Sequence, residues 1–219
     1  MKMYGFWRSL AAYRVRVALK LKGIDYEEEG VNLLAGEQHD PAYLKINPQG
    51  AVPALILDDG TILSQSMAIL EWLEETYPRQ NPLLPTTPNN RARVRSLCHI
   101  AVSDSHPLVV PRIRSYLSKD LALGDATTAK WLNHWSDRSL AIFNDRLTQE
   151  SQTGRYCHGD AVSIADICLA SQVVGATGFF GCSLEPYPKV KQIFESLMQI
   201  AAFEKSLPKH QPGAPAPAA

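Results

Sequence analysis

A proline, a glutamine and a serine occur at a spacing that could hold a small anionic peptide. Pro53, in Val52-Pro53-Ala54-Leu55, directly precedes an apolar strand candidate and removes one donor from its hydrogen-bond ladder. A cis Val52-Pro53 bond would turn the Val52 amide and carbonyl outward, toward the backbone of a ligand. Gln65-Ser66 then begins an apolar helix, whose free amides favour a carboxylate. On residue types alone, an ordinary turn followed by a helix cap remains the alternative.

Ser9 is the residue that could activate a nucleophile in this cradle. It follows the first strand candidate and precedes the first helix candidate. If the ligand carried a thiol, its pKa of about 8.5 would leave it mostly protonated at neutral pH. A hydrogen bond to its charged form is worth about 1.5–3 kcal/mol, which lowers the thiol pKa by about one to two units. A plain helix cap is the alternative role of Ser9.

The first 78 residues have the pattern of a small α/β domain that could position these groups. Apolar residues at helical spacing end at Gly23, a suitable residue for a helix C-terminus. Asp58-Asp59-Gly60 is a hairpin signal between two short apolar runs. In the order βαβ and then ββα, we predict strands at 2–6, 26–32, 54–57 and 61–63, and helices at 12–22, 41–46 and 66–77.

The rest of the chain predicts an all-helical domain. From residue 90 onward the sequence has helical spacing and no strand pattern, and 164–175 is apolar enough to be a central buried helix. Ser163 and Asp166 form a variant of the capping box at its start. The predicted helices are 91–101, 108–117, 126–149, 164–175 and 190–200. The predicted domains are 1–80 and 89–210, with a linker at 81–88 and a disordered tail at 211–219.

Composition excludes several classes of function. The 219 residues contain 22 basic and 22 acidic side chains, which argues against a nucleic-acid partner held by a basic field. Four cysteines without metal-ligand or CxxC spacing indicate free thiols and no metal site. The N-terminus lacks the apolar core of a signal peptide, and no apolar run could span a membrane. We therefore expect a cytoplasmic protein.

Together these segments resemble the soluble glutathione transferases over nearly the whole chain, and most closely their zeta class. The class includes the maleylacetoacetate and maleylpyruvate isomerases. The resemblance implies a thioredoxin-like N-terminal domain, a helical C-terminal domain, glutathione as co-substrate and a homodimer. The segments that carry it are Tyr4-Gly5-Phe6-Trp7-Arg8-Ser9, Arg14-Val15-Arg16-Val17-Ala18-Leu19, Val52-Pro53-Ala54-Leu55, Gln65-Ser66 and Ser163-Ile164-Ala165-Asp166.

The resemblance also implies roles for individual residues. Ser9 would activate the glutathione thiol, whereas Tyr4, the rival activator, lies too early in its strand and is interpreted as packing. The residues expected to hold glutathione are Gln38, Val52, Pro53, Gln65, Ser66, Asp104 and His106. Of these, Gln38 would reach the glycine end, Asp104 would meet the γ-glutamyl amine across a dimer interface, and His106 would line the cleft.

The residues expected near the second substrate are Arg8, Leu10, Ala11 and Pro111, with Arg8 on a carboxylate. For Gln38, Asp104, His106 and Arg8, ordinary surface or capping roles remain alternatives. Arg14 and Arg16 are expected to face solvent or an internal carboxylate.

The chain departs from the zeta pattern at two places. The class signature Ser-Ser-Cys-Ser reads Ser9-Leu10-Ala11-Ala12 here, and residues 177–182 lack the arginine of the isomerases. Because an unpaired buried carboxylate costs several kcal/mol, and because the departures enlarge an apolar surface, we expect a transferase acting on a neutral hydrophobic electrophile.

Three alternatives remain open. The first is a zeta-type cis–trans isomerase. The second is a non-catalytic interaction protein with the same fold, against which Ser9 and Gln65-Ser66 argue. The third, a glutathione-dependent reductase, lacks a cysteine at the start of the first helix.

Overall fold

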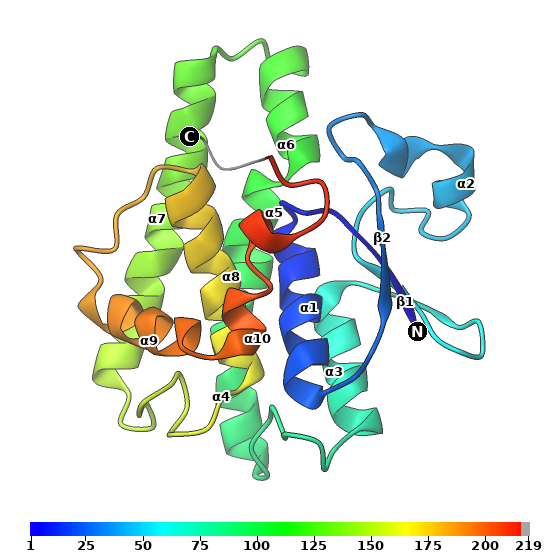
Figure 1. Cartoon of the computed structure of the whole chain (residues 1–219). Coiled ribbons are helices and arrows are strands. Elements are labelled where there is room, and N and C mark those ends of the chain that lie inside the picture. The colour runs from blue at the N-terminus through cyan, green and yellow to red at the C-terminus, as the bar shows by residue number, and fades with distance from the viewer. Residues whose placement is uncertain (216–219) are drawn as a thin grey trace. The chain divides into compact units, whose positions relative to one another are not determined.

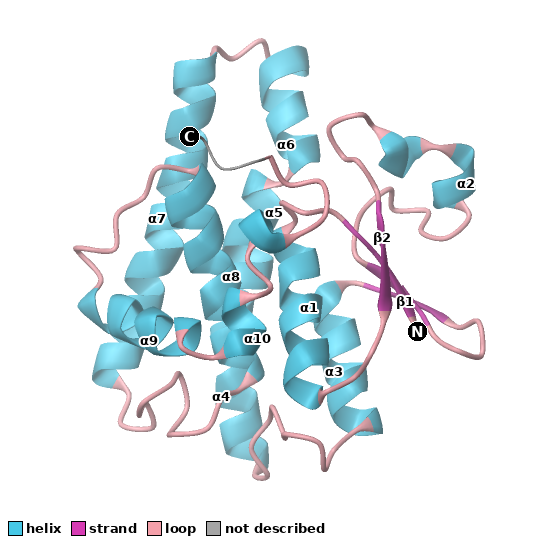
Figure 2. Cartoon of the chain, in the orientation of Figure 1, coloured by secondary structure: helices cyan, strands magenta, loops and turns pink. Residues whose placement is uncertain are grey.

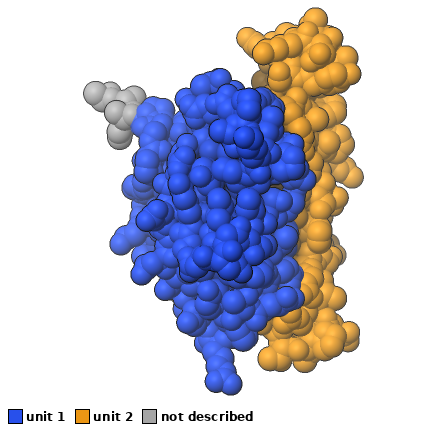
Figure 3. Space-filling view, turned by 90° about the vertical axis from the view of Figure 1, so that its right-hand side faces the viewer, with its two compact units in different colours: residues 1–82, 201–219 blue, residues 83–200 orange. Residues whose placement is uncertain are grey.

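The computed structural model describes residues 1–215, which divide into two compact units (Figure 3). Unit 1 contains residues 1–82 and the segment from Ala201, and unit 2 contains residues 83–200. The sequence had assigned residues 201–210 to the helical domain. In the structure the Tyr13 hydroxyl donates a 3.4 Å hydrogen bond to the carbonyl of buried Phe203, which ties this segment to unit 1. The exact domain boundaries stay a prediction.

Unit 1 is built on a four-stranded sheet with the order β2-β1-β3-β4. Its strands are β1 (Lys2–Gly5), β2 (Glu27–Gly30), β3 (Ala54–Ile56) and β4 (Ile62–Ser64). β1 runs parallel to β2 and antiparallel to β3, and β3 is antiparallel to β4. This mixed sheet confirms the predicted thioredoxin-like α/β arrangement.

Helices cover both faces of this sheet (Figure 1). α1 (Leu10–Lys22) and α3 (Ser66–Thr76) contact each other on one side. The 3₁₀ turn η1 (Glu37–His39) and α2 (Pro41–Leu44) lie on the other. The predicted end of α1 is confirmed: Gly23 has a φ of 65°, a left-handed conformation that glycine adopts without steric cost.

A small apolar cluster lies on the side of the sheet that carries α2. Its buried members are Phe6, Val31, Tyr43 and Val52. The Tyr43 hydroxyl donates a 2.7 Å hydrogen bond to the carbonyl of Ala51. This cluster therefore holds the loop before β3, which contains Val52, against the rest of unit 1.

Residues 83–200 contain no strand, as Figure 2 shows, and the predicted helical domain is confirmed. Its α-helices are α4 (Pro88–His99), α5 (His106–Val109), α6 (Pro111–Ser115), α7 (Asp125–Gln149), α8 (Ile164–Phe179) and α9 (Pro188–Met198). Every residue from 164 to 176 is buried, so α8 is the expected central helix. Asp166 accepts 2.8 Å hydrogen bonds from the amide and the hydroxyl of Ser163, which confirms the capping interaction.

The helix after α4 differs from the prediction. Instead of breaking near Pro107, the chain continues through a π-helical segment, η2 (Ile100–Ser105), directly into α5. Pro107 follows closely after this π-helical segment and has no amide proton to donate to the preceding helical turn. A second π-helical segment, η3 (Tyr116–Asp120), follows α6. Such segments are frequent near functional sites.

The chain after α9 adds α10 (Ala201–Glu204) and the 3₁₀ turn η4 (Pro208–His210) to unit 1. Gln211, assigned to a disordered tail from the sequence, is buried and donates 2.9 Å hydrogen bonds to the carbonyls of Lys205 and Leu207. The last part of the predicted tail, residues 216–219, lies outside the described residues. None of the helices within residues 1–215 has the length and apolar character needed to cross a membrane.

Candidate functional site

Ser9 both caps α1 and keeps a proton to donate. Its Oγ atom accepts a 3.1 Å hydrogen bond from the amide of Ala12, and its own amide donates to the carbonyl of Phe6 at 2.9 Å. A hydroxyl group also carries one proton, for which residues 1–215 provide no acceptor. Because Ser9 is half-buried, a bound group can reach this hydroxyl. The capping role and the activating role are therefore compatible.

The start of α3 has no side-chain cap. The first intrahelical bond there joins the Ile69 amide to the Gln65 carbonyl at 3.0 Å, and no side chain caps the first turn. Gln65 has a φ of 67°, which is unusual for a residue with a Cβ atom and recurs at functional sites. Its Nε2 atom donates a 3.0 Å hydrogen bond to Oε1 of Gln49. Amides and positive potential at a helix start favour an anion.

Ser66 is buried beside Arg14 of α1. The Nε atom of Arg14 donates a 3.0 Å hydrogen bond to the Oγ atom of Ser66, and only 3% of Arg14 and 5% of Ser66 are exposed. Arg14 therefore does not face solvent. The expectation for Arg16 holds, since its Nε atom lies 3.0 Å from both carboxylate oxygens of Glu28.

The loop between α2 and β3 leaves further polar groups available. The Val52-Pro53 peptide is cis, and neither the amide nor the carbonyl of Val52 has a hydrogen-bond partner within residues 1–215. Gln38, in η1, has a buried Oε1 atom without a partner in the same range. Buried polar atoms are usually hydrogen-bonded, so a ligand that supplies donors and acceptors would satisfy these groups.

The residues around Ser9 differ from the expected apolar surface. Leu10 is 6% exposed and Ala11 is 9% exposed. An apolar substitution enlarges an apolar surface only where its side chain is exposed, so these two positions contribute little to one. Arg8 is half-buried, and burial lowers the pKa of its guanidinium below its ordinary value. Arginine nevertheless stays charged at neutral pH, which leaves a cation beside Ser9 in the sequence.

The remaining sequence-predicted residues belong to unit 2. Asp104 is exposed on the π-helical segment η2, and His106 begins α5. Pro111 is exposed at the start of α6. Their predicted contacts with ligands stay predictions.

Sequence reasoning missed Arg14 and Gln49 as parts of this site. Arg14 stands in a helix whose residues from Leu10 to Leu19 are all buried, and its apolar neighbours were a signal that it is enclosed. Gln49 belongs to the polar turn before Pro53, and only its contact with Gln65 identifies it.

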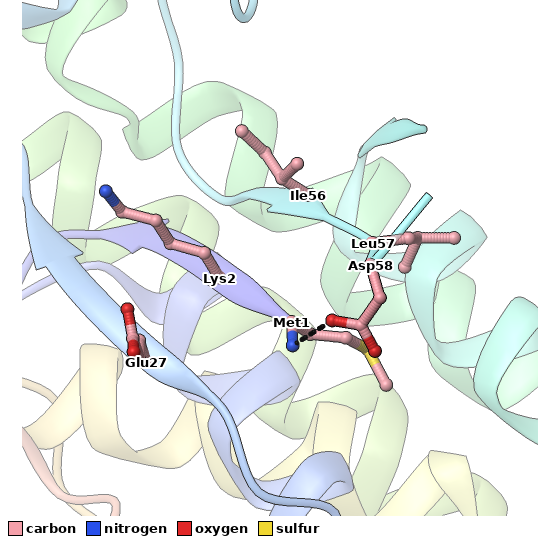
Figure 4. Close-up of a pocket in the computed structure, with 6 residues that line it drawn as sticks. All are labelled: Met1, Lys2, Glu27, Ile56, Leu57 and Asp58. Carbon is pink, nitrogen blue, oxygen red and sulfur yellow. Dashed lines mark hydrogen bonds and ion pairs between the residues drawn. The ribbon is translucent and has the colours of Figure 1, made fainter. Parts of the chain in front are cut away.

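Other candidate places in the chain offer less chemistry. A shallow pocket lies at the start of β1, where the terminal amine of Met1 pairs with Asp58 at 2.7 Å (Figure 4). Ser9 follows the opposite end of that strand. Cys98, Cys157 and Cys168 are buried free thiols, and burial raises the pKa of Cys98 and Cys157 well above the ordinary value. The part of the chain that the structure describes has no group of three metal-ligating side chains.

Comparisons with known proteins show the family to which the chain belongs. Residues 8–76 match the family model "Glutathione S-transferase, N-terminal domain". The chain is 51% identical to a maleylacetoacetate isomerase from Methylobacterium extorquens AM1, whose crystal structure contains malonate and glutathione. That match covers 99% of this chain and 100% of the other, with a TM-score of 0.96. A zeta-class maleylpyruvate isomerase is 38% identical over 98% of this chain and 100% of its own, with a TM-score of 0.94.

A curated maleylacetoacetate isomerase from Pseudomonas aeruginosa is 38% identical, covering 99% of this chain and all of the relative. A thioredoxin-like sheet followed by a helical unit, with a serine after the first strand, defines a soluble glutathione transferase. The chain belongs to the zeta class of that enzyme family.

Proposed function

We propose that this enzyme is a glutathione-dependent cis–trans isomerase acting on a maleyl-substituted keto acid. The observation that carries the proposal is full-length similarity to maleylacetoacetate and maleylpyruvate isomerases, with identities from 38% to 51%. This favours the alternative that the sequence had ranked second, over a transferase for neutral hydrophobic electrophiles. We also propose a cytoplasmic homodimer, as the family resemblance implies.

The residues of unit 1 fit glutathione by their unsatisfied groups. The free amide and carbonyl of Val52 suit the backbone of the cysteinyl residue. The hydroxyl of Ser66 and the amides at the start of α3 suit the γ-glutamyl carboxylate. The buried Oε1 atom of Gln38 lacks a partner, and turning the amide would present its donors to the glycine end.

Ser9 supplies the hydrogen bond that favours a thiolate over a thiol. Its amide and its Oγ atom are fixed by bonds to Phe6 and Ala12, so the hydroxyl is held in place before a ligand arrives. Such a bond to a charged group, at about 1.5–3 kcal/mol, makes the thiolate a major species near neutral pH. A thiolate that adds to a cis double bond permits rotation and then leaves, so glutathione is regenerated.

Two substrate carboxylates need cationic partners, and the absent arginine in residues 177–182 had argued against an isomerase. From the sequence, Arg8 alone was left to serve a substrate with two carboxylates. Arg8 is charged and half-buried. We propose Arg8 as a partner of one substrate carboxylate.

The test exploits the regeneration of glutathione. Maleylpyruvate is incubated with the enzyme and glutathione at one-hundredth of its concentration, and both are followed by proton NMR. Complete conversion to the trans isomer with free glutathione unchanged supports the proposal. A reaction that stops when glutathione is used up identifies a conjugating transferase and contradicts it.

A further inference from the structure

In the buried pair of Arg14 and Ser66, the donor and the acceptor of the hydrogen bond are fixed, which would not be so for a serine alone. Arginine carries five N–H donors and no acceptor, whereas a hydroxyl has one proton and two lone pairs. Because the Nε atom of Arg14 donates to Oγ of Ser66 at 3.0 Å, Ser66 must act as acceptor in this bond. Its own proton points elsewhere, and residues 1–215 offer no acceptor for it.

We propose that Arg14 is a positioning residue that makes Ser66 an obligatory donor toward the γ-glutamyl carboxylate of glutathione. The inference rests on the proposed glutathione site and adds the residue that sets its selectivity for an anion. Both side chains are at least 95% buried, so the polarity of the hydroxyl is fixed by protein and not by exchange with solvent.

The position of the pair strengthens this selectivity. Ser66 is the first residue of α3, where uncapped amides carry positive potential. Because its guanidinium is charged, Arg14 donates a stronger hydrogen bond to Ser66 than a neutral group would, and this bond polarises the Ser66 hydroxyl as a donor. A ligand group that itself donates, such as an ammonium, would meet the Ser66 proton unfavourably.

The test compares glutathione with 4-aminobutanoyl-cysteinyl-glycine, which lacks only the γ-glutamyl carboxylate. Calorimetry gives, for each protein variant, the dissociation constant of the analogue divided by that of glutathione. We expect Arg14→Met to lower this ratio by about tenfold, the effect of weakening one charge-assisted contact. Because Arg14 acts through the hydroxyl, adding Arg14→Met to Ser66→Ala should lower the ratio little further.

Arg16→Met is the matched control, because Arg16 is an equally buried arginine two residues along α1 whose partners are Glu28 and the carbonyl of Phe6. It should leave the ratio unchanged. If Arg14→Met does not fold, Arg14→Gln takes its place with the same expected direction. An equal loss of affinity for both ligands shows a merely structural Arg14 and overturns the inference alone. A wild-type ratio near one contradicts the proposed carboxylate site and the inference with it.

Discussion

The side chains of Arg14 and Ser66 come from helices 52 residues apart in the chain and form a buried hydrogen bond of 3.0 Å. Ser66 begins α3, next to Gln65 with its positive φ. The bond connects the first helix of unit 1 to the donors at the start of α3. The proposed binding of a carboxylate at that point depends on this hydroxyl.

Ser66→Ala should weaken glutathione binding by about 10- to 100-fold, because a hydrogen bond to a carboxylate is worth about 1.5–3 kcal/mol. Gln65→Ala should weaken it less, since the side chain of Gln65 already donates its hydrogen bond to Gln49. Titration calorimetry measures both. Unchanged affinity in both variants would remove glutathione from this part of the molecule.

Ser9→Ala should lower turnover far more than glutathione affinity, since its hydrogen bond acts on the ionised thiol. An ultraviolet difference titration of the bound tripeptide should show a thiol pKa below that of free glutathione, and this shift should vanish in the variant. Tyr4→Phe should preserve the shift. If Tyr4→Phe abolishes it instead, the activator has been misassigned.

The capping role of Ser9 needs its own control. Replacing a capping serine by alanine costs about 1 kcal/mol of stability, whereas glycine costs only a few tenths. Ser9→Gly should therefore lose activity with little loss of stability in urea unfolding, and Ser9→Thr should keep both. Activity that follows the stability of the variants would point to a purely structural serine.

Arg8→Met should lower kcat/KM for maleylpyruvate by about 10- to 100-fold, because one charge-assisted carboxylate contact is lost. Conjugation of 1-chloro-2,4-dinitrobenzene, which has no carboxylate, should change little. Equal losses on both substrates in Arg8→Met would show that Arg8 supports the structure near Ser9 and binds no carboxylate.

The thiols of the native enzyme should react slowly. Burial, and then the negative charge of Asp137, raise the pKa of the half-buried Cys182 to about 11. At pH 8 this leaves about one thiolate in a thousand, so labelling should be about two orders of magnitude slower than for free cysteine. The rate should rise about tenfold per pH unit up to about pH 11. Stopped-flow labelling with a disulfide reagent checks this, and a fast-reacting thiol at pH 7 would contradict it.

The elements of the site that depend on local sequence could be predicted. The cap at Ser9, the turn before Pro53 and the start of α3 at Ser66 are each determined by a few adjacent residues, and all are present in the structure. Contacts between distant segments could not be predicted. Periodicity shows that a helix is apolar but not which neighbour Arg14 meets.

Exposure was the other quantity that the sequence did not provide. Leu10 replaces a polar residue of the zeta signature, and the sequence therefore predicted an apolar surface. Leu10 is buried, however, so the substitution changes packing more than the surface of the site. The predicted preference for neutral hydrophobic substrates therefore rested on side chains that are largely inaccessible to a substrate.

The ratio of two specificity constants tests the central claim most directly. Purified enzyme is assayed at one pH and one glutathione concentration for isomerisation of maleylpyruvate and for conjugation of 1-chloro-2,4-dinitrobenzene. Two carboxylate contacts of about 1.4 kcal/mol each favour the isomerisation by about 100-fold in kcat/KM. A ratio of this size or larger is the predicted result. Conjugation that equals or exceeds isomerisation would contradict the account and restore the transferase for neutral electrophiles.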